Sequence, residues 1–396
     1  MYIRNYKYLI VLLIILFFSD CARKPQSTIT YVNTGQSGEI EFDLTNALLS
    51  EPSTVFDDMI DSIKIIPLET ITPSLVSERI SSICFSPQNI FVNDHRNVIV
   101  FTQQGKFVKT LDKGQGPNEV GFPEAMSYDE KNGFLYVYDG MSRKIMKYTQ
   151  EGEFLSYHVV NAFIRDLSVS DTLTLIAHHV GRNHNFAISI GDTIGNFHNS
   201  FVFGEEKYPF VFDKYILPFN GGFNIKKLLD NKIYIFRNDS IYAKFSLKYP
   251  VPNIDFSQYR KISELESSLQ KGEFLFTGDF IETNDYLFTI FRTNGFRTKE
   301  LITNKKTGRS ICRSYKPHSL INRIYLNIDH VLTSNSNWFL GIIKPETFTS
   351  DAVREEFRWD GSNPNNLISE GDMAKLKAVK PDDNPIIVLF KLKDDI

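Results

Sequence analysis

The sequence has little of the material from which disulfide frameworks and zinc centres are built, with 3 cysteines and 8 histidines among 396 residues. Cys84 and Cys312 fall in different repeats of the pattern described below, which predicts that they are too far apart to form a disulfide. The chain has no long basic run and no acidic tail, and its formal net charge is −3. Nucleic acid is therefore not an expected partner.

The N-terminus has the order of features found in exported proteins. Arg4 and Lys7 precede an unbroken apolar run from Leu9 to Phe18. This run has the length of a secretory signal and is too short to span a bilayer unaided. We therefore predict a signal peptide over residues 1–20.

The four residues Phe18-Ser19-Asp20-Cys21 resemble the lipobox of bacterial lipoproteins, in which the cysteine is lipidated and becomes the mature N-terminus. Asp20 stands where such motifs usually have Gly or Ala. The alternative is an ordinary signal peptide, or an uncleaved anchor, with Cys21 incidental. Ala22-Arg23-Lys24 lacks the acidic stretch that similar surface lipoproteins often carry. These features favour an anchor in the outer membrane that faces the periplasm.

The body of the chain favours β-structure. Phe, Tyr and Trp make up 13% of the residues, with 33 Phe and 18 Tyr, and these types suit pleated, half-buried surfaces. Two consecutive segments repeat the same order of four short strands. In this alignment Asp94 matches Asp139, and the turn glycines Gly105 and Gly152 lie 47 positions apart. Four strands at that period are the signature of a propeller blade.

Later repeats are more diverged but keep the strand rhythm. The third runs from about 164 to 203, the fourth from about 222 to 256, the fifth from 279 to 315, and the last starts near 324. In the fourth repeat we expect 232–236 and 241–245 to be the inner strands. Ser257 to Lys271 is expected to be helical, and Asp351 to Val379 is a second insertion with some helical character.

The stretch from Ile66-Pro67-Leu68-Glu69-Thr70 to Gly152-Glu153-Phe154 resembles the six-bladed β-propeller lipoproteins abundant in Bacteroidetes, whose repeats are related to the NHL type. Gly114-Gln115-Gly116-Pro117-Asn118-Glu119 is similar to the Gly-rich loop after that family's first blade, with Asn118 where Gly is usual. The resemblance implies an all-β, six-bladed propeller of four-stranded antiparallel blades. It implies hardly any chemistry, because the family is defined by its fold.

The ring of a propeller must close, or its first and last blades keep open edges. Ile63 to Leu68 precedes the first complete repeat, and Pro385 to Leu392 ends the chain in an apolar run. We expect these two segments to complete the sixth blade together. The expected domains are therefore the signal peptide at 1–20, a tether and lead-in at 21–61, with a short helical turn near 55–60, and the propeller at 62–396.

Two motifs admit both a chemical and a structural interpretation. Gly114 to Glu119 lacks the Lys-Ser/Thr of a phosphate loop and precedes no helix pattern, so a connection between blades is the favoured interpretation. Asp94 and Asp139 are also candidate metal ligands at the channel mouth. Because they recur in the same place, we expect them to accept hydrogen bonds from the backbone of their own turns.

Metal chemistry has weak support in the sequence. His178, His179 and His184 form the only histidine cluster, but adjacent residues of a strand face opposite sides, so at most two of the three can share a site. Propeller hydrolases of the gluconolactonase kind resemble this architecture and hold calcium in the central channel. Candidate oxygen ligands exist near blade entrances at Glu78, Glu119 and Glu124. No catalytic residue, metal ligand or cofactor is assigned.

Aromatic residues crowd the link between the third and fourth repeats. We predict a binding contact at Tyr208, Phe210, Phe212 and Tyr215, with local core packing as the alternative. The sequence thus favours a non-catalytic lipoprotein of the cell envelope that binds an unknown protein or glycan and reaches the membrane through its N-terminal lipid. The alternative function is a metal-dependent hydrolase or lyase with its site in the central channel.

Overall fold

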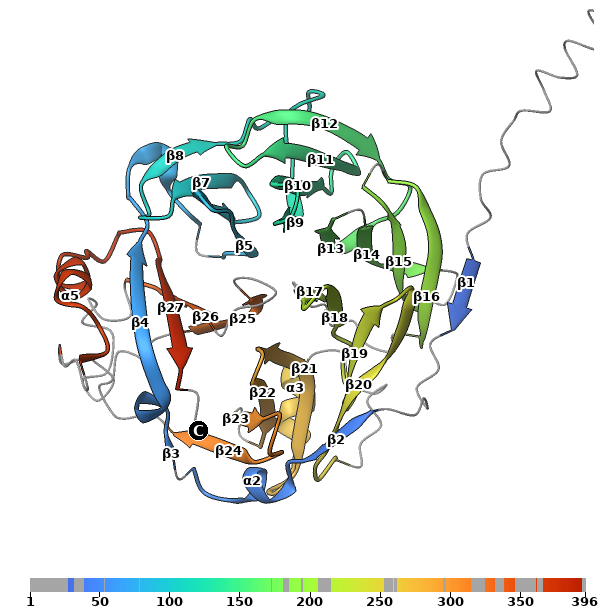
Figure 1. The fold of residues 1–396 in the computed structure, drawn as a ribbon, viewed down its shortest axis with the longest axis vertical. Helices are drawn as coiled ribbons and strands as arrows, with labels where there is room; N and C mark the ends of the chain where they lie inside the picture. The colour runs from blue at the N-terminus through green and yellow to red at the C-terminus, as the bar shows by residue number, and fades with distance from the viewer. Residues whose placement is uncertain are drawn as a thin grey trace, which may run out of the picture.

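Six β-sheets are arranged around one central axis in the computed structural model, and each sheet forms one blade of a propeller (Figure 1). The structure describes residues 28–31, 39–52, 54–77, 79–171, 173–180, 185–193, 195–205, 215–252, 259, 262–294, 297–314, 325–331, 338–345, 361 and 366–393. Each blade contains four antiparallel strands, and the predicted six-bladed architecture is confirmed.

The blades follow one another along the chain. Their strands, from the centre outward, are β5 (Ser82–Phe85), β6 (Asn89–Asn93), β7 (Val98–Thr102) and β8 (Phe107–Thr110); β9 (Pro123–Asp129), β10 (Phe134–Asp139), β11 (Lys144–Thr149) and β12 (Phe154–Val159); β13 (Ile164–Ser170), β14 (Leu173–Val180), β15 (Asn185–Asp192) and β16 (Phe197–Glu205); β17 (Ile216–Phe219), β18 (Gly222–Ile225), β19 (Lys232–Arg237) and β20 (Ser240–Lys248); β21 (Phe274–Glu282), β22 (Tyr286–Thr293), β23 (Arg297–Asn304) and β24 (Ser310–Ser314); and β25 (Tyr325–Val331), β26 (Trp338–Ile343), β27 (Ile386–Leu392) and β4 (Ile60–Pro67).

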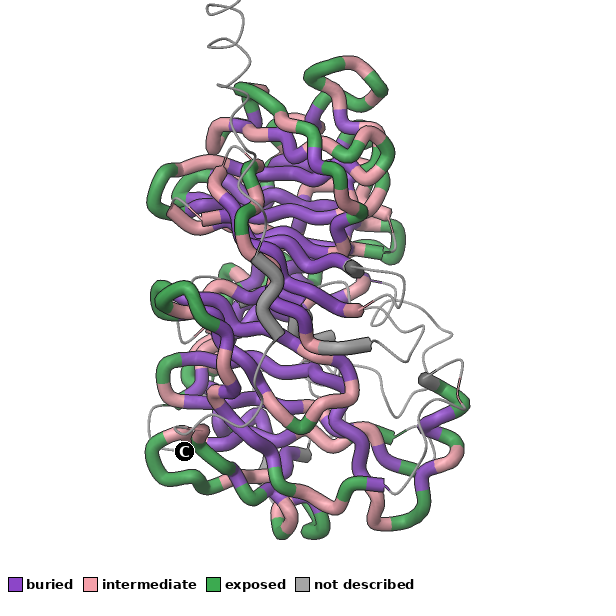
Figure 2. Tube along the Cα trace, turned by 90° about the vertical axis from the view of Figure 1, so that its right-hand side faces the viewer, coloured by how far each residue is buried: buried purple, intermediate pink, exposed green. Residues whose placement is uncertain are grey.

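The core lies between the blades, because both faces of each sheet pack against a neighbour. Strand β6 is therefore buried at every position from Asn89 to Asn93, and β21 is buried along its whole length. Such strands read as nearly continuous apolar runs rather than alternating ones, as sheets covered on both faces do. Figure 2 shows the same arrangement, with buried strands across the interior and exposed turns at the margins.

The predicted closure of the ring is confirmed. Strand β4 pairs antiparallel with β27, from Ile386 opposite Pro67 to Leu392 opposite Ile60. The N-terminal segment thus supplies the outermost strand of a blade whose other three strands come from the C-terminal part of the chain (Figure 1). The expected turn near 55–60 is the 3-10 helix Phe56–Met59.

The lead-in residues form more than a tether. Strands β1 (Thr28–Tyr31), β2 (Ile40–Asp43) and β3 (Thr54–Val55) pair in parallel with the outermost strands β16, β20 and β24 of blades three, four and five. In Figure 1 these blue strands lie along the rim of the ring. The pairing satisfies backbone groups that an open outer edge would leave exposed, which is why short segments without a strong pattern are ordered there. We call β1, β2 and β3 the outer belt.

The fourth blade differs from the prediction. Its inner strand is β17, and the segments expected to be inner strands belong to β19 and β20, the third and fourth strands. Pro218 within β17 explains the error, because proline in a short apolar run reads as a break. The remaining helices are α2 (Thr45–Leu49), the 3-10 turn Thr72–Ser74, α3 (Ile262–Ser268) and α5 (Glu370–Lys377). Across the described residues, no helix is long and apolar enough to cross a membrane.

Candidate functional site

The ring has two ends, because each blade repeats the same strand order. At the entry end the inner strand of a blade begins and its second strand finishes. At the turn end the inner strand finishes and a tight turn leads into the second strand. Both ends carry buried polar side chains.

Asp94 and Asp139 occupy equivalent buried positions at the entry end, where second strands finish. Oδ1 of Asp94 accepts hydrogen bonds from the backbone N–H groups of Arg96 and Asn97, at 2.9 and 2.7 Å. Oδ1 of Asp139 accepts from the backbone N–H groups of Phe122 and Met141, at 2.8 and 3.1 Å. The predicted structural role is confirmed, since both carboxylates hold turns together.

The glycine-rich connection after the first blade folds around its own glutamate. Oε2 of Glu119 accepts a hydrogen bond of 2.9 Å from the backbone N–H of Gly116. A Cβ atom at Gly114 would collide with the same carboxylate. The loop therefore uses its glycines to admit Glu119, as expected of a connection between blades.

An apolar surface lies at the entry end of the second and third blades. It consists of Phe122, Met141 and Phe163, whose exposed fractions are 42%, 60% and 48%; we call it the entry-end surface. Phe122 lies just before β9, Met141 just after β10, and Phe163 just before β13. Backbone bonds to one carboxylate, that of Asp139, fix the first two positions.

Tyr138 connects Phe163 to the same site. The Tyr138 hydroxyl donates to the carbonyl of Ala162 at 3.2 Å and accepts from the backbone N–H of Ile164 at 3.4 Å. The residues on both sides of Phe163 are thereby bonded to a side chain of β10. Three exposed apolar side chains are therefore presented from backbone that is fixed by partly or fully buried hydrogen bonds.

Glu124 and Arg165 add charge to this surface. Burial raises the pKa of the Glu124 carboxyl, and the nearby Arg165 guanidinium lowers it in part. A Cβ atom at Gly140 would collide with Glu124 Oε2, so glycine is required for the carboxylate to lie there. Arg165 lies over the ring of Phe163, 5.1 Å from its centroid, and its Nε is buried with no hydrogen-bond partner among the described residues. The surface thus combines apolar area with one acid and one base.

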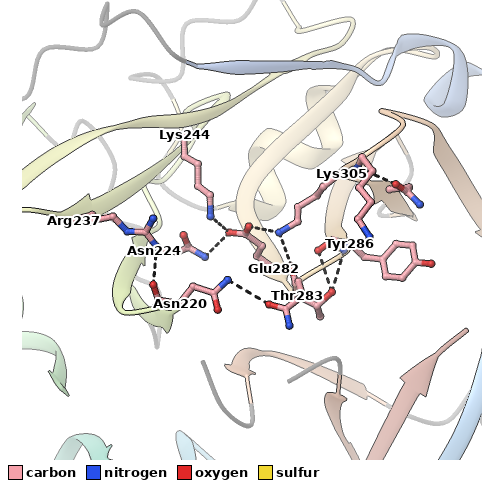
Figure 3. Close-up of polar contacts among 11 residues, drawn as sticks. Asn220, Asn224, Arg237, Lys244, Glu282, Thr283, Tyr286 and Lys305 are labelled. Atoms are coloured by element: carbon pink, nitrogen blue, oxygen red, sulfur yellow. Dashed lines mark hydrogen bonds and ion pairs between the residues drawn. The ribbon is translucent and has the colours of Figure 1, made fainter. Parts of the chain in front are cut away.

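A second polar cluster lies at the turn end between blades four and five (Figure 3). Glu282, the last residue of inner strand β21, has a fully buried side chain. Its Oε2 accepts from Lys244 Nζ at 2.5 Å and from Asn224 Nδ2 at 2.9 Å, and its Oε1 accepts from Lys305 Nζ at 2.6 Å. We call Asn224, Lys244, Glu282 and Lys305 the Glu282 cluster.

Sequence reasoning missed the Glu282 cluster, and at the entry-end surface it named only Glu124, as a candidate oxygen ligand. The members of the Glu282 cluster come from β18, β20, β21 and the turn after β23, so no local spacing connects them. Phe122 and Phe163 carried a weak signal, because each is a large aromatic residue directly before the inner strand of a blade. Another unpredicted carboxylate, the buried Asp166, joins blades three and four by accepting from the backbone N–H groups of Tyr215 and Ile216, at 2.7 and 2.8 Å.

The structure places only some of the residues that were predicted to form a site. Tyr215 is fully buried, with its ring centroid 5.0 Å from that of Phe186. Tyr215 therefore packs in the core, as the alternative interpretation of the aromatic link proposed, and it cannot make the predicted surface contact. Tyr208, Phe210 and Phe212 lie outside the described residues, as do Cys21, Glu78 and His184.

The histidine cluster and the cysteines can be placed in part. His178 is buried in β14, and its Nε2 lies 2.6 Å from Ser189 Oγ. Cys84 and Cys312 lie in different blades and are not joined by a disulfide. No group of three or more His, Cys, Asp or Glu side chains is arranged to hold a metal ion in the part of the chain that the structure describes.

Comparisons with known proteins identify a family model and solved structures to which the chain is similar. A family model described as "Domain of unknown function (DUF4934)" matches residues 39–391. The crystal structure of a Bacteroides fragilis NCTC 9343 protein that is described as exported superimposes with a TM-score of 0.67 and 15% identity, over 90% of this chain and 99% of that one. A DUF4221 family member from Bacteroides vulgatus gives a TM-score of 0.46 and 7% identity, over 84% and 97% of the two chains. None of the curated proteins matches.

Proposed function

The chain belongs to the family described as a domain of unknown function, DUF4934, and we propose that it is a non-catalytic binding propeller of the cell envelope. In this proposal the entry-end surface captures a protein or glycan ligand. The observation that carries it is the exposure of Phe122, Met141 and Phe163 on backbone held by Asp139 and Tyr138. Aromatic residues and Met are enriched where proteins bind partners, and a rigid scaffold reduces the entropy lost on binding.

The chemistry of the neighbouring residues supports binding over catalysis. The repeated carboxylates Asp94 and Asp139 are already occupied by backbone N–H groups, so they serve the turns. Arg165 lies over the ring of Phe163 and close to Glu124, and the two charged groups can orient a ligand that also has apolar area. Burying the exposed part of one such apolar side chain contributes on the order of 1 kcal/mol, so three of them suit a modest affinity.

Site-specific photo-crosslinking in cells tests the proposal. A photoreactive residue at Phe122, Met141 or Phe163 should give one discrete adduct that mass spectrometry can identify. Leu155 and Val159 are matched controls, because both are apolar and exposed on the outer strand β12. Equal adducts at control and test positions would contradict the proposal, and so would chelator-sensitive hydrolysis of lactones by the purified protein. The same probe at Phe210 tests the contact predicted around Tyr208, Phe210 and Phe212.

The proposed compartment rests on the N-terminal sequence and on the exported B. fragilis structure that resembles this one. We infer that Cys21 is lipidated and that the propeller is anchored to the outer membrane, facing the periplasm. Replacing Cys21 with Ser should move the protein from the membrane fraction to the soluble fraction, because a lipidated N-terminus is the anchor in this account. A Cys21→Ser protein that stays as membrane-bound as the parent would refute lipid anchoring. Digestion of the propeller by protease on intact cells would refute the periplasmic orientation.

A further inference from the structure

The Glu282 cluster has more positive than negative charge. One carboxylate, Glu282, is shared by the ammonium groups of Lys244 and Lys305. Arg237 lies near enough to repel the Lys244 charge. Figure 3 shows Lys244 reaching the carboxylate from β20 and Lys305 reaching it from the turn after β23, with Arg237 on the side of Lys244. Together with Arg237, the two lysines bring three positive charges around the single negative charge of Glu282.

These charges lie in a partly dehydrated place. The side chains of Lys244 and Lys305 are only 21% and 16% exposed, and that of Glu282 is not exposed. Burial lowers the pKa of Lys244, Glu282 opposes this effect, and Lys305 and Arg237 lower the pKa further. Dehydrated ammonium groups that repel one another gain more from an arriving anion than hydrated surface lysines do.

Both ammonium groups keep N–H donors for an additional acceptor. Lys305 donates to Glu282 at 2.6 Å and to the carbonyl of Thr283 at 2.6 Å, and Lys244 donates to Glu282. Each ammonium group has three N–H donors. The ring of Phe219 lies within cation–π distance of both lysines, 4.5 Å from Lys244 Nζ and 5.0 Å from Lys305 Nζ. This shared contact helps to hold both ammonium groups near the carboxylate.

Asn224 provides an independent sign of a ligand. Its Nδ2 is used by Glu282, whereas its Oδ1 is buried and has no hydrogen-bond partner among the described residues. Figure 3 shows this oxygen directed away from the Glu282 carboxylate. A buried acceptor without a donor is costly, so a ligand hydroxyl beside the anionic group would stabilise the site.

We propose that Lys244 and Lys305 form a binding site for an oxyanion group, such as a carboxylate, sulfate or phosphate, on a ligand that reaches the turn end of blades four and five. The unpaired acceptor of Asn224 favours ligands that carry a hydroxyl next to the anion, as a sugar acid does. This site lies at the opposite end of the ring from the entry-end surface. Its existence does not depend on the proposed binding of a partner there.

Calorimetric titration at constant ionic strength tests the site with glucuronate, inorganic sulfate and inorganic phosphate, and with glucose as the neutral probe. Glucuronate should bind more tightly than the inorganic anions, and glucose should not bind. Lys244→Met and Lys305→Met should each weaken glucuronate binding by about tenfold or more, because a hydrogen bond to a charged group is lost. The control Lys306→Met changes charge in the same turn but involves an exposed lysine paired with Asp285, so it should bind as the parent does.

A second measurement needs no variant and so does not depend on how the variants fold. Glucuronate should protect Lys244 and Lys305 of the full protein from acetylation, read peptide by peptide, while Lys306 and Lys131 react at an unchanged rate. The absence of binding by all three anions, or equal protection of all four lysines, would overturn the proposal. Either result would leave a structural ion pair between two blades. Neither result bears on crosslinking at Phe122, so the two proposals fail separately.

Discussion

Replacing Phe42 with alanine tests whether the outer belt is a structural part of the propeller. Phe42 in β2 is only 3% exposed, and its ring centroid lies 5.3 Å from that of Phe245 in β20. It belongs to a buried cluster that also includes Leu44 and Leu48 on the belt side and residues of blades four and five on the other. A tether would gain nothing from a phenylalanine at this position, whereas a structural strand would.

The expected loss can be estimated from this burial. Removing a buried Phe side chain costs about 3–5 kcal/mol when the cavity does not collapse, which is a large part of a total stability of about 5–15 kcal/mol. Ile40, two residues earlier on the same strand, is 52% exposed and provides the matched control. Ile40→Ala should change the stability by less than about 0.5 kcal/mol.

Urea unfolding followed by circular dichroism measures both variants. Phe42→Ala should lower the midpoint clearly at an unchanged slope, and Ile40→Ala should not. If the two midpoints coincide with that of the parent, β2 contributes nothing to the folded state and the belt is a tether after all. If the slope of Phe42→Ala also falls, the variant has lost cooperative unfolding, and the comparison then needs limited proteolysis of the belt.

Two further changes have defined outcomes. Deleting Asn384 to Ile396 removes β27, which pairs with both β26 and β4, so soluble folded protein should be lost. Deleting only residues 394–396 should leave the yield of soluble folded protein unchanged. If the protein that lacks β27 melts as the parent does, the closure argument is refuted. Glu124→Gln should raise the melting temperature at pH 8 but not near pH 4. The pKa of Glu124 is raised in the folded state, so its contribution to stability is lost as the pH rises from the unfolded pKa through the folded pKa. Gln carries no charge at either pH, so the variant does not suffer that loss. A variant that melts below the parent at pH 8 would show that Arg165 outweighs the desolvation.

Much of the fold was predictable because the first two blades repeat residues that each bind or shape the backbone of one turn. Asp94 and Asp139 hold equivalent turns, and Gly105 and Gly152 adopt positive φ angles of 82° and 79° in equivalent hairpins. Such residues are specified by local geometry, so they recur at a regular spacing. Ring closure was also predictable, since two unpaired apolar segments at the ends of a ring can satisfy only each other.

The parts that could not be predicted depend on distant pairing. Strand β17 has four residues and contains Pro218, and β3 has only two residues, so neither carries a period. These segments form strands because they pair with neighbouring strands that are distant in the sequence. The Glu282 cluster is similar, because Asn224, Lys244 and Lys305 meet one carboxylate only after two blades have packed together. The aromatic link was assigned to a surface, yet Tyr215 within it is needed in the core.

The pairing of β4 with β27 has a consequence for how the protein is made. On a ribosome β4 is made long before its partner strand β27, whereas β1 and β2 pair with the earlier strands β16 and β20. A nascent chain therefore cannot pair β4 until residues 386–392 have also been made, and pairings this distant in sequence form slowly. Through that interval the apolar segment around Ile63 stays open to aggregation. A chaperone that holds the leading segment during and after synthesis is thus a greater need for this protein than for a domain whose neighbours in sequence are also neighbours in space.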